Sequence, residues 1–213
     1  MITSELLEAY LACPMKCYLQ SSGEKCSGNK FSAWYETQKE SYRRVGTRRL
    51  EASLPQELIR NQIAPRDFRK AQWQLALNQV LDTDDLSANI HAIQRVPTEG
   101  RLSEFIPVRF VHLNKLSRAN KMTAVFDAIV LSKVAGQPIS VAKVIHGDAW
   151  TTMKARVAAH VHELTKTFGK MRVLLAAASP PDLVLNRHCP ECEFRDRCRK
   201  RAIEKDDLSL LTG

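Results

Sequence analysis

Apolar positions in the N-terminal part of the chain recur at helical spacing. A first helix, capped by Thr3 or Ser4, reaches Cys13-Pro14, where the proline interrupts or ends it. A second helix is predicted from Ser32 to about Ser53, and Gly46 is a weak point inside it. Residues 54–82 continue a partly helical, amphipathic pattern. Their expected core residues are Trp73, Leu75, Leu77 and Val80.

The pattern changes to strict alternation further along the chain. Residues 87–96 alternate apolar and polar side chains, which predicts a strand, and residues 104–113 predict a second one. Pro97-Thr-Glu-Gly100 between them is typical of a turn. We therefore expect an antiparallel hairpin or part of a meander.

Residues 120–134 are compatible with two structures. Their apolar side chains follow the i, i+3, i+4, i+7 rule, and Gly136 lies where a helix C-cap belongs, so we predict a helix. A strand over 121–132 is the alternative. A strand over 138–145 and a long helix from about Thr151 to Ala178 follow.

Together these elements predict an α/β protein with a short mixed sheet. We expect one domain covering residues 1–213. It would comprise a helical part (1–82), an α/β core (83–178) and a cysteine-cluster segment (179–213).

Charge narrows the class of partner. Lys and Arg number 32 against 23 Asp and Glu, which gives a formal charge of +9. A protein this basic often binds nucleic acid, although general solubility is the plain alternative. The N-terminus has no basic region of a signal peptide, and no apolar stretch is long enough to span a bilayer. We therefore expect a cytoplasmic protein without membrane association, in which thiols stay reduced.

The cysteines carry the clearest chemical signal. Cys189, Cys192 and Cys198 form a C-x2-C-x5-C pattern, and three more cysteines, Cys13, Cys17 and Cys26, lie near the N-terminus. Thiolates at this spacing can bind one metal centre, and a four-ligand site needs one further cysteine. Three late ligands and one early ligand would join the two ends of the chain. An iron–sulfur cluster and a four-cysteine zinc site both fit, and ordinary thiols are the alternative.

Two stretches of the sequence resemble a known family. The start, from Ser4-Glu-Leu-Leu-Glu through Cys13-Pro14 to Tyr18-Leu19, is similar to the entry motif of RecB-like nucleases. The stretch from His188 to Arg199 resembles their iron–sulfur cysteine motif. The combination occurs in CRISPR-associated RecB-like exonucleases and in the nuclease domain of AddAB-type helicase–nucleases. It also occurs in RecB-like nucleases of unassigned role, which the tail Lys205-Asp-Asp-Leu-Ser-Leu-Leu resembles most.

This resemblance implies a restriction-endonuclease-like, PD-(D/E)xK core and a [4Fe–4S] cluster. Cys13 matches the family's early cysteine, so the implied ligands are Cys13, Cys189, Cys192 and Cys198, with Cys17 as the alternative to Cys13 and zinc as the alternative metal. Cys26, in a Ser/Gly-rich loop, is expected to be a free thiol.

The family's catalytic motif is incomplete here in two alignments. In the preferred one, the hairpin carries the motif, and His91 stands at the first acid, Val108-Arg109-Phe110 at (D/E)-x-K, and Met122 and Phe126 at Q-x3-Y. In the second, residues 121–132 are a strand. Asp127 is then the first acid and Lys143 the lysine, with His146 or Asp148 as a substitute ligand. Mg²⁺ or Mn²⁺ would be needed only if such a site were active.

The resemblance also implies a DNA partner, either single-stranded DNA or a duplex end. The expected backbone contacts are Arg187, Arg195, Arg197, Arg199, Lys200 and Arg201. We expect a nuclease-fold, iron–sulfur DNA-binding protein with a degenerate catalytic site, acting in DNA processing, repair or defence as a scaffold or subunit beside a helicase or nuclease. The alternatives are an active metal-dependent deoxyribonuclease that uses Asp127 and Lys143, and a zinc-stapled interaction module.

Overall fold

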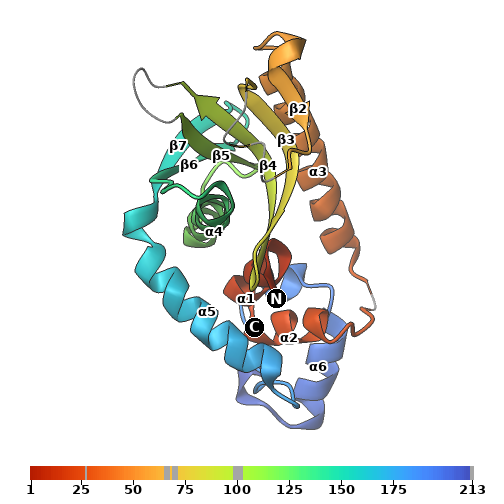
Figure 1. The fold of residues 1–213 in the computed structure, drawn as a ribbon. Helices are drawn as coiled ribbons and strands as arrows, with labels where there is room; N and C mark the ends of the chain where they lie inside the picture. The colour runs from red at the N-terminus through yellow and green to blue at the C-terminus, as the bar shows by residue number, and fades with distance from the viewer. Residues whose placement is uncertain (27, 65–67, 69–71, 98–102, 212–213) are drawn as a thin grey trace. The chain divides into compact units, whose positions relative to one another are not determined.

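A mixed β-sheet organises the chain in the computed structural model (Figure 1). The structure describes residues 1–26, 28–64, 68, 72–97 and 103–211. Within them the sheet has seven strands, ordered β2-β3-β4-β5-β6-β7, with β1 paired to β4. The strands are β1 (Ile2–Thr3), β2 (Ile59–Asn61), β3 (Leu75–Asp82), β4 (Leu86–Val96), β5 (Glu104–Val111), β6 (Val141–His146) and β7 (Thr151–Arg156).

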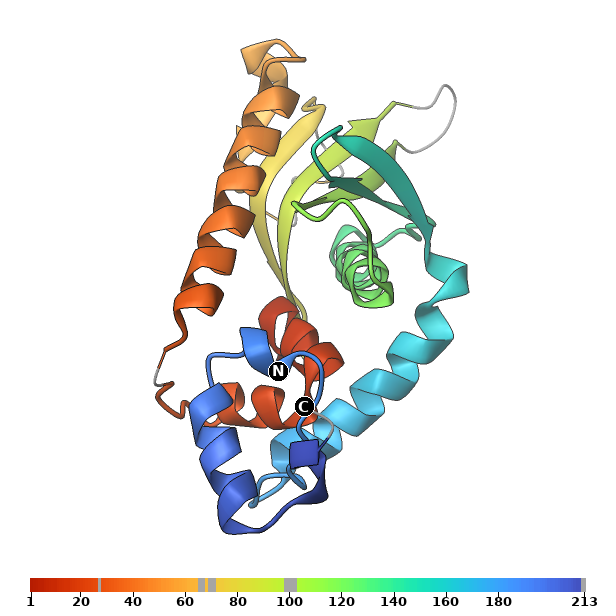
Figure 2. The same cartoon turned by 180° about the vertical axis from the view of Figure 1, so that it is seen from behind.

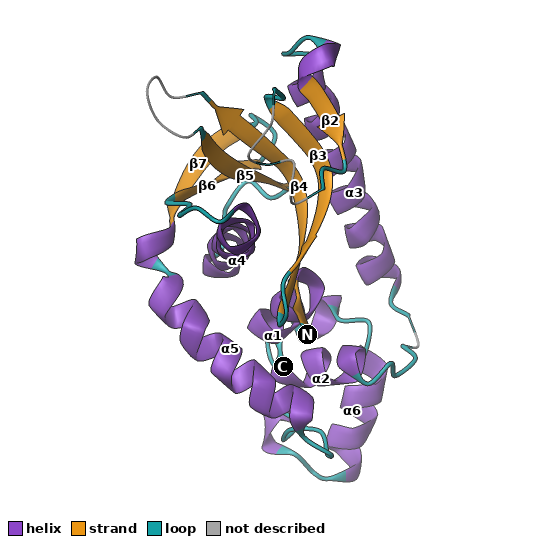
Figure 3. Cartoon of the chain, viewed as in Figure 1, coloured by secondary structure: helices purple, strands orange, loops and turns teal. Residues whose placement is uncertain are grey.

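Along the chain, helices precede, separate and follow these strands (Figure 3). The α-helices are α1 (Ser4–Ala12), α2 (Pro14–Ser21), α3 (Lys30–Glu51), α4 (Arg118–Ala135), α5 (Val161–Ala176) and α6 (Arg195–Glu204). Short 3-10 helices occur at η1 (Gln56–Leu58), η3 (Val157–Ala159), η4 (Cys189–Glu191) and η5 (Leu208–Leu211). No helix within the described residues combines the length and apolar character that crossing a membrane requires.

The chain divides into two compact units, which we describe separately. The first unit contains Met1–Ser4 and Lys39–Thr167, and the second contains Glu5–Gln38 and Phe168–Gly213. These units do not coincide with the three sequence segments expected above, because each unit is assembled from stretches far apart in the sequence.

The sheet of the first unit has a helix on each face (Figures 1 and 2). On one face, Tyr42 and Leu50 of α3 pack on a core of strand residues: Ile59, Leu75, Leu77, Ala92, Val108 and Phe110. On the other face lies α4, most of whose side chains are buried. Strands β3, β4 and β5 form an antiparallel meander, and β6 joins β5 in parallel after α4.

The structure confirms the predicted hairpin and the helix that follows it. Residues 86–96 and 104–111 are the paired strands β4 and β5. Helix α4 begins with a capping box, in which the Ser117 and Asn120 side chains bond each other's backbone N–H, and it ends at Gly136 with φ of 66°. The strand alternative for 121–132 is therefore wrong. Most of the predicted turn at 97–100 lies outside the described residues.

Two helical predictions are wrong. Residues 75–82 form strand β3, in which the polar Gln79 is buried and Val80 is 60% exposed. The apolar pattern of these residues therefore does not follow their burial, and it predicted the wrong element. The predicted long helix from Thr151 begins only at Val161, because Thr151–Arg156 pairs with β6 as the sheet's edge strand. That strand buries only Ala155, so it lacks the alternation that identifies a half-buried strand.

Candidate functional site

The late cysteines of the second unit lie on a tight turn and the helix after it. The N–H of Cys192 bonds the carbonyl of Cys189 at 3.1 Å, which closes the 3-10 turn η4. Cys198 follows in the second turn of α6, where it is buried. The local sequence therefore presents all three thiols from one short, turn-rich segment.

Polar contacts join this segment to the early cysteines. Glu193 accepts a hydrogen bond from Gln20 at 2.8 Å and forms an ion pair with Lys16 at 2.9 Å. The Asn186 amide donates to the carbonyl of Ala12 at 3.3 Å. Cys13 lies between these contacts as the N-cap residue of α2, with Pro14 as the first helical residue. Residues about 175 positions apart are thereby brought side by side.

The thiols share an apolar environment. Cys13 and Cys192 pack against a buried cluster of Met15, Leu19, Phe194 and Cys198. Burial raises the pKa of Cys198, and the charges of Cys13 and Cys189 raise it further. Burial likewise raises the pKa of Cys192 to about 11, with Cys198 among the contributing charges. Cys13, Cys192 and Cys198 thus share one apolar cluster, and Cys189 is close enough to affect the pKa of Cys198.

The remaining cysteines have different surroundings. Cys17 is fully buried, and burial followed by the charge of Cys13 raises its pKa to about 11. Cys26 is exposed. All six cysteines are free thiols. Among the described residues, no three His, Cys, Asp or Glu side chains are placed as ligands of one metal ion, so the four neighbouring thiols do not converge on a point.

Hydrogen-bond donors surround the thiols. The backbone N–H of Asn186 donates to Cys189 Sγ at 3.1 Å, and that of Phe194 donates to Cys192 Sγ at 3.5 Å. Arg197 forms an ion pair with Glu24 and lowers the pKa of Cys198 against the effect of burial. Within the described residues, its buried Nη1 has no hydrogen-bond partner. These donors favour a negatively charged group at the cysteines.

The basic residues predicted to contact DNA divide into two groups. Arg187, Arg195, Arg199 and Lys200 are exposed. Arg197 and Arg201 are partly buried, and the ion pair with Glu24 directs Arg197 inward. Arg197 is therefore not placed as a free phosphate contact.

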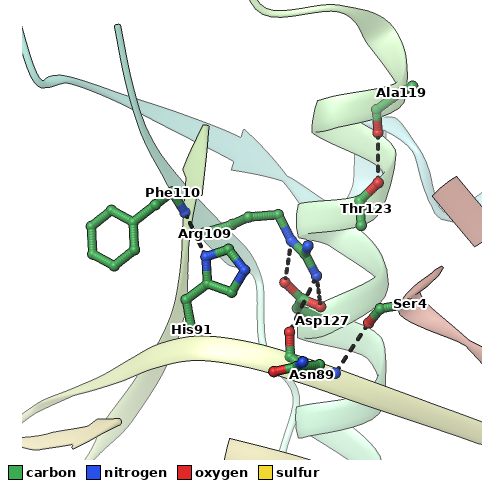
Figure 4. A network of polar contacts seen from close by, with 8 residues as sticks. All are labelled: Ser4, Asn89, His91, Arg109, Phe110, Ala119, Thr123 and Asp127. Carbon is green, nitrogen blue, oxygen red and sulfur yellow. Dashed lines mark hydrogen bonds and ion pairs between the residues drawn. The ribbon is translucent and has the colours of Figure 1, made fainter. Parts of the chain in front are cut away.

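In the first unit, Asp127 lies in a buried ion pair (Figure 4). Arg109 Nε contacts Asp127 Oδ2 at 2.9 Å and Arg109 Nη2 contacts Oδ1 at 2.7 Å, so the pairing is bidentate. Asp127 is 1% exposed and Arg109 is 6% exposed. Both carboxylate oxygens of Asp127 are therefore occupied by the guanidinium of β5.

His91 lies beside this pair, where the β4–β5 ladder stops. The paired residues end at Ala92 and Val108, and the N–H of Phe110 donates to His91 Nδ1 at 3.0 Å (Figure 4). Burial, and then the charges of Arg109, Arg43 and Lys39, hold the pKa of His91 well below its usual value. His91 is therefore a neutral hydrogen-bond acceptor at Nδ1 that completes the backbone pairing.

The second catalytic alignment loses its geometry. Asp127 is on helix α4, whereas Lys143 is on β6 and donates to Gln94 at 2.6 Å. Burial and the charge of Lys154 lower the pKa of Lys143. Asp148 is exposed and accepts from Asn114 at 2.8 Å, and His146 contacts the Leu113 carbonyl. Asp127 thus bonds to Arg109, and Lys143 bonds to Gln94.

Sequence reasoning missed several of these relations. An Asp among the apolar residues of a buried helix needs a buried cation as its partner. Arg109, among the apolar residues of a predicted strand, is the sequence signal that could have identified this cation. Asn29 was also missed, although Asn before a helix is typical of an N-cap. The exposure of Trp34, at 53%, was missed too.

Comparisons with known proteins assign no family. No family model matches the chain, and no curated protein matches it significantly. Solved structures do match, among them the crystal structure of SSO0001, which covers 93% of this chain and 85% of its own with 12% identity and a TM-score of 0.49. Values this low assign neither a family nor an activity.

Proposed function

We propose that this chain is a DNA-binding protein of RecB-like nuclease fold that carries a cysteine-bound [4Fe–4S] cluster and no longer cleaves DNA. The observation that carries the proposal is the Arg109–Asp127 ion pair, which occupies both oxygens of the acid that the second alignment places at the first catalytic position. A nuclease of this type needs carboxylates that are free to bind Mg²⁺ or Mn²⁺.

The place where the β4–β5 ladder stops also supports the loss of catalysis. In the preferred alignment, Val108 stands at the acid of (D/E)-x-K, while His91 stands at the first acid and Arg109 at the x position. Here both serve the fold, because His91 accepts from a backbone N–H and Arg109 neutralises Asp127. The neutralised pair also leaves no net negative charge there to attract a divalent ion.

The chemistry of the cysteine pocket supports a cluster. The proposed ligands are Cys13, Cys192 and Cys198, which share an apolar cluster, and Cys189, whose charge acts on Cys198. Thiolate-bound clusters carry negative charge and accept hydrogen bonds at sulfur. The two backbone N–H groups and the unpartnered Nη1 of Arg197 are donors of the kind such a cluster needs. The cluster would supply a covalent cross-link between the two ends of the chain.

DNA binding is supported by charge. The chain carries +9, and four exposed cations lie within the cysteine-cluster segment: Arg187, Arg195, Arg199 and Lys200. Their role would be to contact phosphates in a sequence-independent manner. A helicase or nuclease subunit is the partner that such a non-catalytic scaffold would serve.

A combined binding and cleavage assay tests the proposal. The anaerobically purified protein should bind single-stranded or end-containing duplex DNA in a salt-dependent manner, and neither Mg²⁺ nor Mn²⁺ should yield cleavage products. Replacing Arg199 and Lys200 by Gln should reduce the slope of log affinity against log salt by up to about 2. The matched control replaces Lys166 and Lys170, exposed on α5, in the same way.

Two results would overturn the proposal. Metal-dependent cleavage that disappears in Asp127→Asn would favour the active deoxyribonuclease. Absent DNA binding, together with stoichiometric zinc, would favour the zinc-stapled interaction module.

A further inference from the structure

The first two turns of α3 expose a row of aromatic side chains in the second unit. Phe31 and Trp34 are 43% and 53% exposed. The ring centroid of Phe31 lies 5.5 Å from that of Trp34 and 6.3 Å from that of Tyr35, the latter pair being stacked. Spacings of three and four residues place all three rings on one side of the helix. Large apolar side chains grouped at the surface mark an interaction site.

Asn29 fixes this aromatic turn to the cysteine segment. Its side-chain oxygen caps α3 by accepting from the N–H of Phe31 at 2.9 Å. Its amide nitrogen donates to the carbonyl of Pro190 at 3.0 Å and to that of Cys192 at 3.4 Å. One side chain thus holds the exposed rings beside the cysteine turn.

The charge around these rings is positive. Lys25, Lys30, Arg187 and Arg195 are exposed, and none of them forms an ion pair with any residue that the structure describes. Lys30 directly precedes Phe31, and Arg195 begins the helix that follows Cys192. Of the nearby acids, Glu24 is ion-paired with Arg197 and Glu36 also has a partner. Glu191 and Asp196 are exposed, so the four cations outnumber the exposed acids. Exposed rings beside unneutralised cations match bases and phosphates together.

We infer that Phe31 and Trp34 form a stacking platform for the bases of single-stranded DNA, with the neighbouring cations contacting its phosphates. This inference rests on the proposed function and names the strand type that it recognises. Duplex DNA keeps its bases stacked inside the helix, so the platform adds affinity only for single strands.

Fluorescence provides the direct test. Trp73 is buried, and Trp150 is stacked on Tyr42 with Arg49 over its ring, so Trp34 is the tryptophan most accessible to a bound base. An oligothymidine of about 20 nucleotides, longer than the ~4–16 nucleotide sites of such surfaces, should quench the emission. Trp34→Phe should abolish most of this quenching while retaining most of the affinity.

Affinity separates stacking from general charge attraction. Trp34→Ala should weaken oligothymidine binding roughly 5- to 150-fold and leave binding to a hairpin-capped duplex unchanged. Val173→Ala, at a position that is 75% exposed on α5, is the control and should change neither.

The outcomes distinguish the two levels of the proposal. Equal affinity of Trp34→Ala and wild type for oligothymidine would overturn the platform alone, as would an equal loss for both DNA forms. A wild-type protein that binds no DNA would overturn the proposed function itself.

Discussion

At the scale of single residues, the first unit contains opposite charges that neutralise each other in its interior. Asp127 and Arg109 are both almost fully buried and bond through two parallel contacts. Removing both charged groups of such a pair is often tolerated, whereas removing one leaves an uncompensated buried charge. The pair is therefore structural.

Stability measurements on single and double variants check this role. Asp127→Leu should cost about 3–5 kcal/mol in the free energy of unfolding, and Arg109→Met with Asp127→Leu should recover much of that loss. Lys133→Met, which breaks the exposed pair with Asp85, should cost less than about 1 kcal/mol. Urea unfolding gives these values. An Asp127→Leu variant as stable as wild type would contradict the assignment.

His91 predicts a pH dependence. The pKa of His91 in the folded protein lies well below the ordinary 6.5. Below about pH 6.5, the unfolded chain therefore binds a proton at this histidine before the folded protein does. Stability should therefore be fully present above about pH 6.5 and fall as the pH drops below it, by at most about 1.4 kcal/mol per pH unit. His91→Asn, which keeps an acceptor but does not titrate, should flatten this dependence. The exposed His162→Asn should retain it.

At the scale of elements, α3 is held on the sheet by a close approach and a stack. Trp150 lies parallel to Tyr42 with ring centroids 4.2 Å apart, and Arg49 covers the Trp150 ring. Gly46 faces Phe110 so closely that an added Cβ would lie 2.5 Å from the ring. The weak point that the sequence indicated at Gly46 is thus a packing requirement.

Two glycine substitutions, one in this contact and one where an added Cβ meets nothing, test the packing. Gly46→Ala should lower stability by up to about 2 kcal/mol, because an overpacking cost of about 1–3 kcal/mol outweighs the ~1 kcal/mol gain in helix propensity. Gly169→Ala in α5, where a Cβ meets nothing within 4 Å, should raise stability by up to about 1 kcal/mol. Thermal and urea unfolding of both variants make the comparison. A stabilising Gly46→Ala would contradict the packing account.

Local signals predicted part of this fold. The alternation in 87–96 and the cap at Gly136 identified β4, β5 and α4, because those patterns are set within each element. Strand β3 was missed because Gln79 is buried through bonds to Ile63 and Leu77, which inverts the apolar pattern. The pairing of Asp127 with Arg109 depends on two elements meeting, which periodicity does not encode.

At the scale of the whole chain, the cysteines join sequence ends that are far apart. A centre bound by Cys13 and Cys198 would close a loop of 198 − 13 = 185 residues. Closing a long loop restricts the unfolded chain, so the centre would stabilise the fold by several kcal/mol. The spacing of the late cysteines indicated a metal site, but only the folded α2 brings Cys13 beside them.

Thermal unfolding measures this contribution. Under anaerobic conditions, Cys192→Ser should lower the melting temperature by on the order of 5–10 °C, since about 1 kcal/mol corresponds to 2–4 °C in a chain of this size. The exposed Cys26→Ser should leave it unchanged. Equal melting temperatures for the two variants would show that Cys192 binds no stabilising centre.

The most direct measurement of the central claim is iron, sulfide and zinc analysis of the anaerobically purified protein, with its visible absorbance. The account predicts about four irons and four sulfides per chain in wild type and in Cys26→Ser, with most of both lost in Cys192→Ser. Wild-type protein without iron, or a Cys192→Ser variant that keeps the full metal content and absorbance, would contradict it.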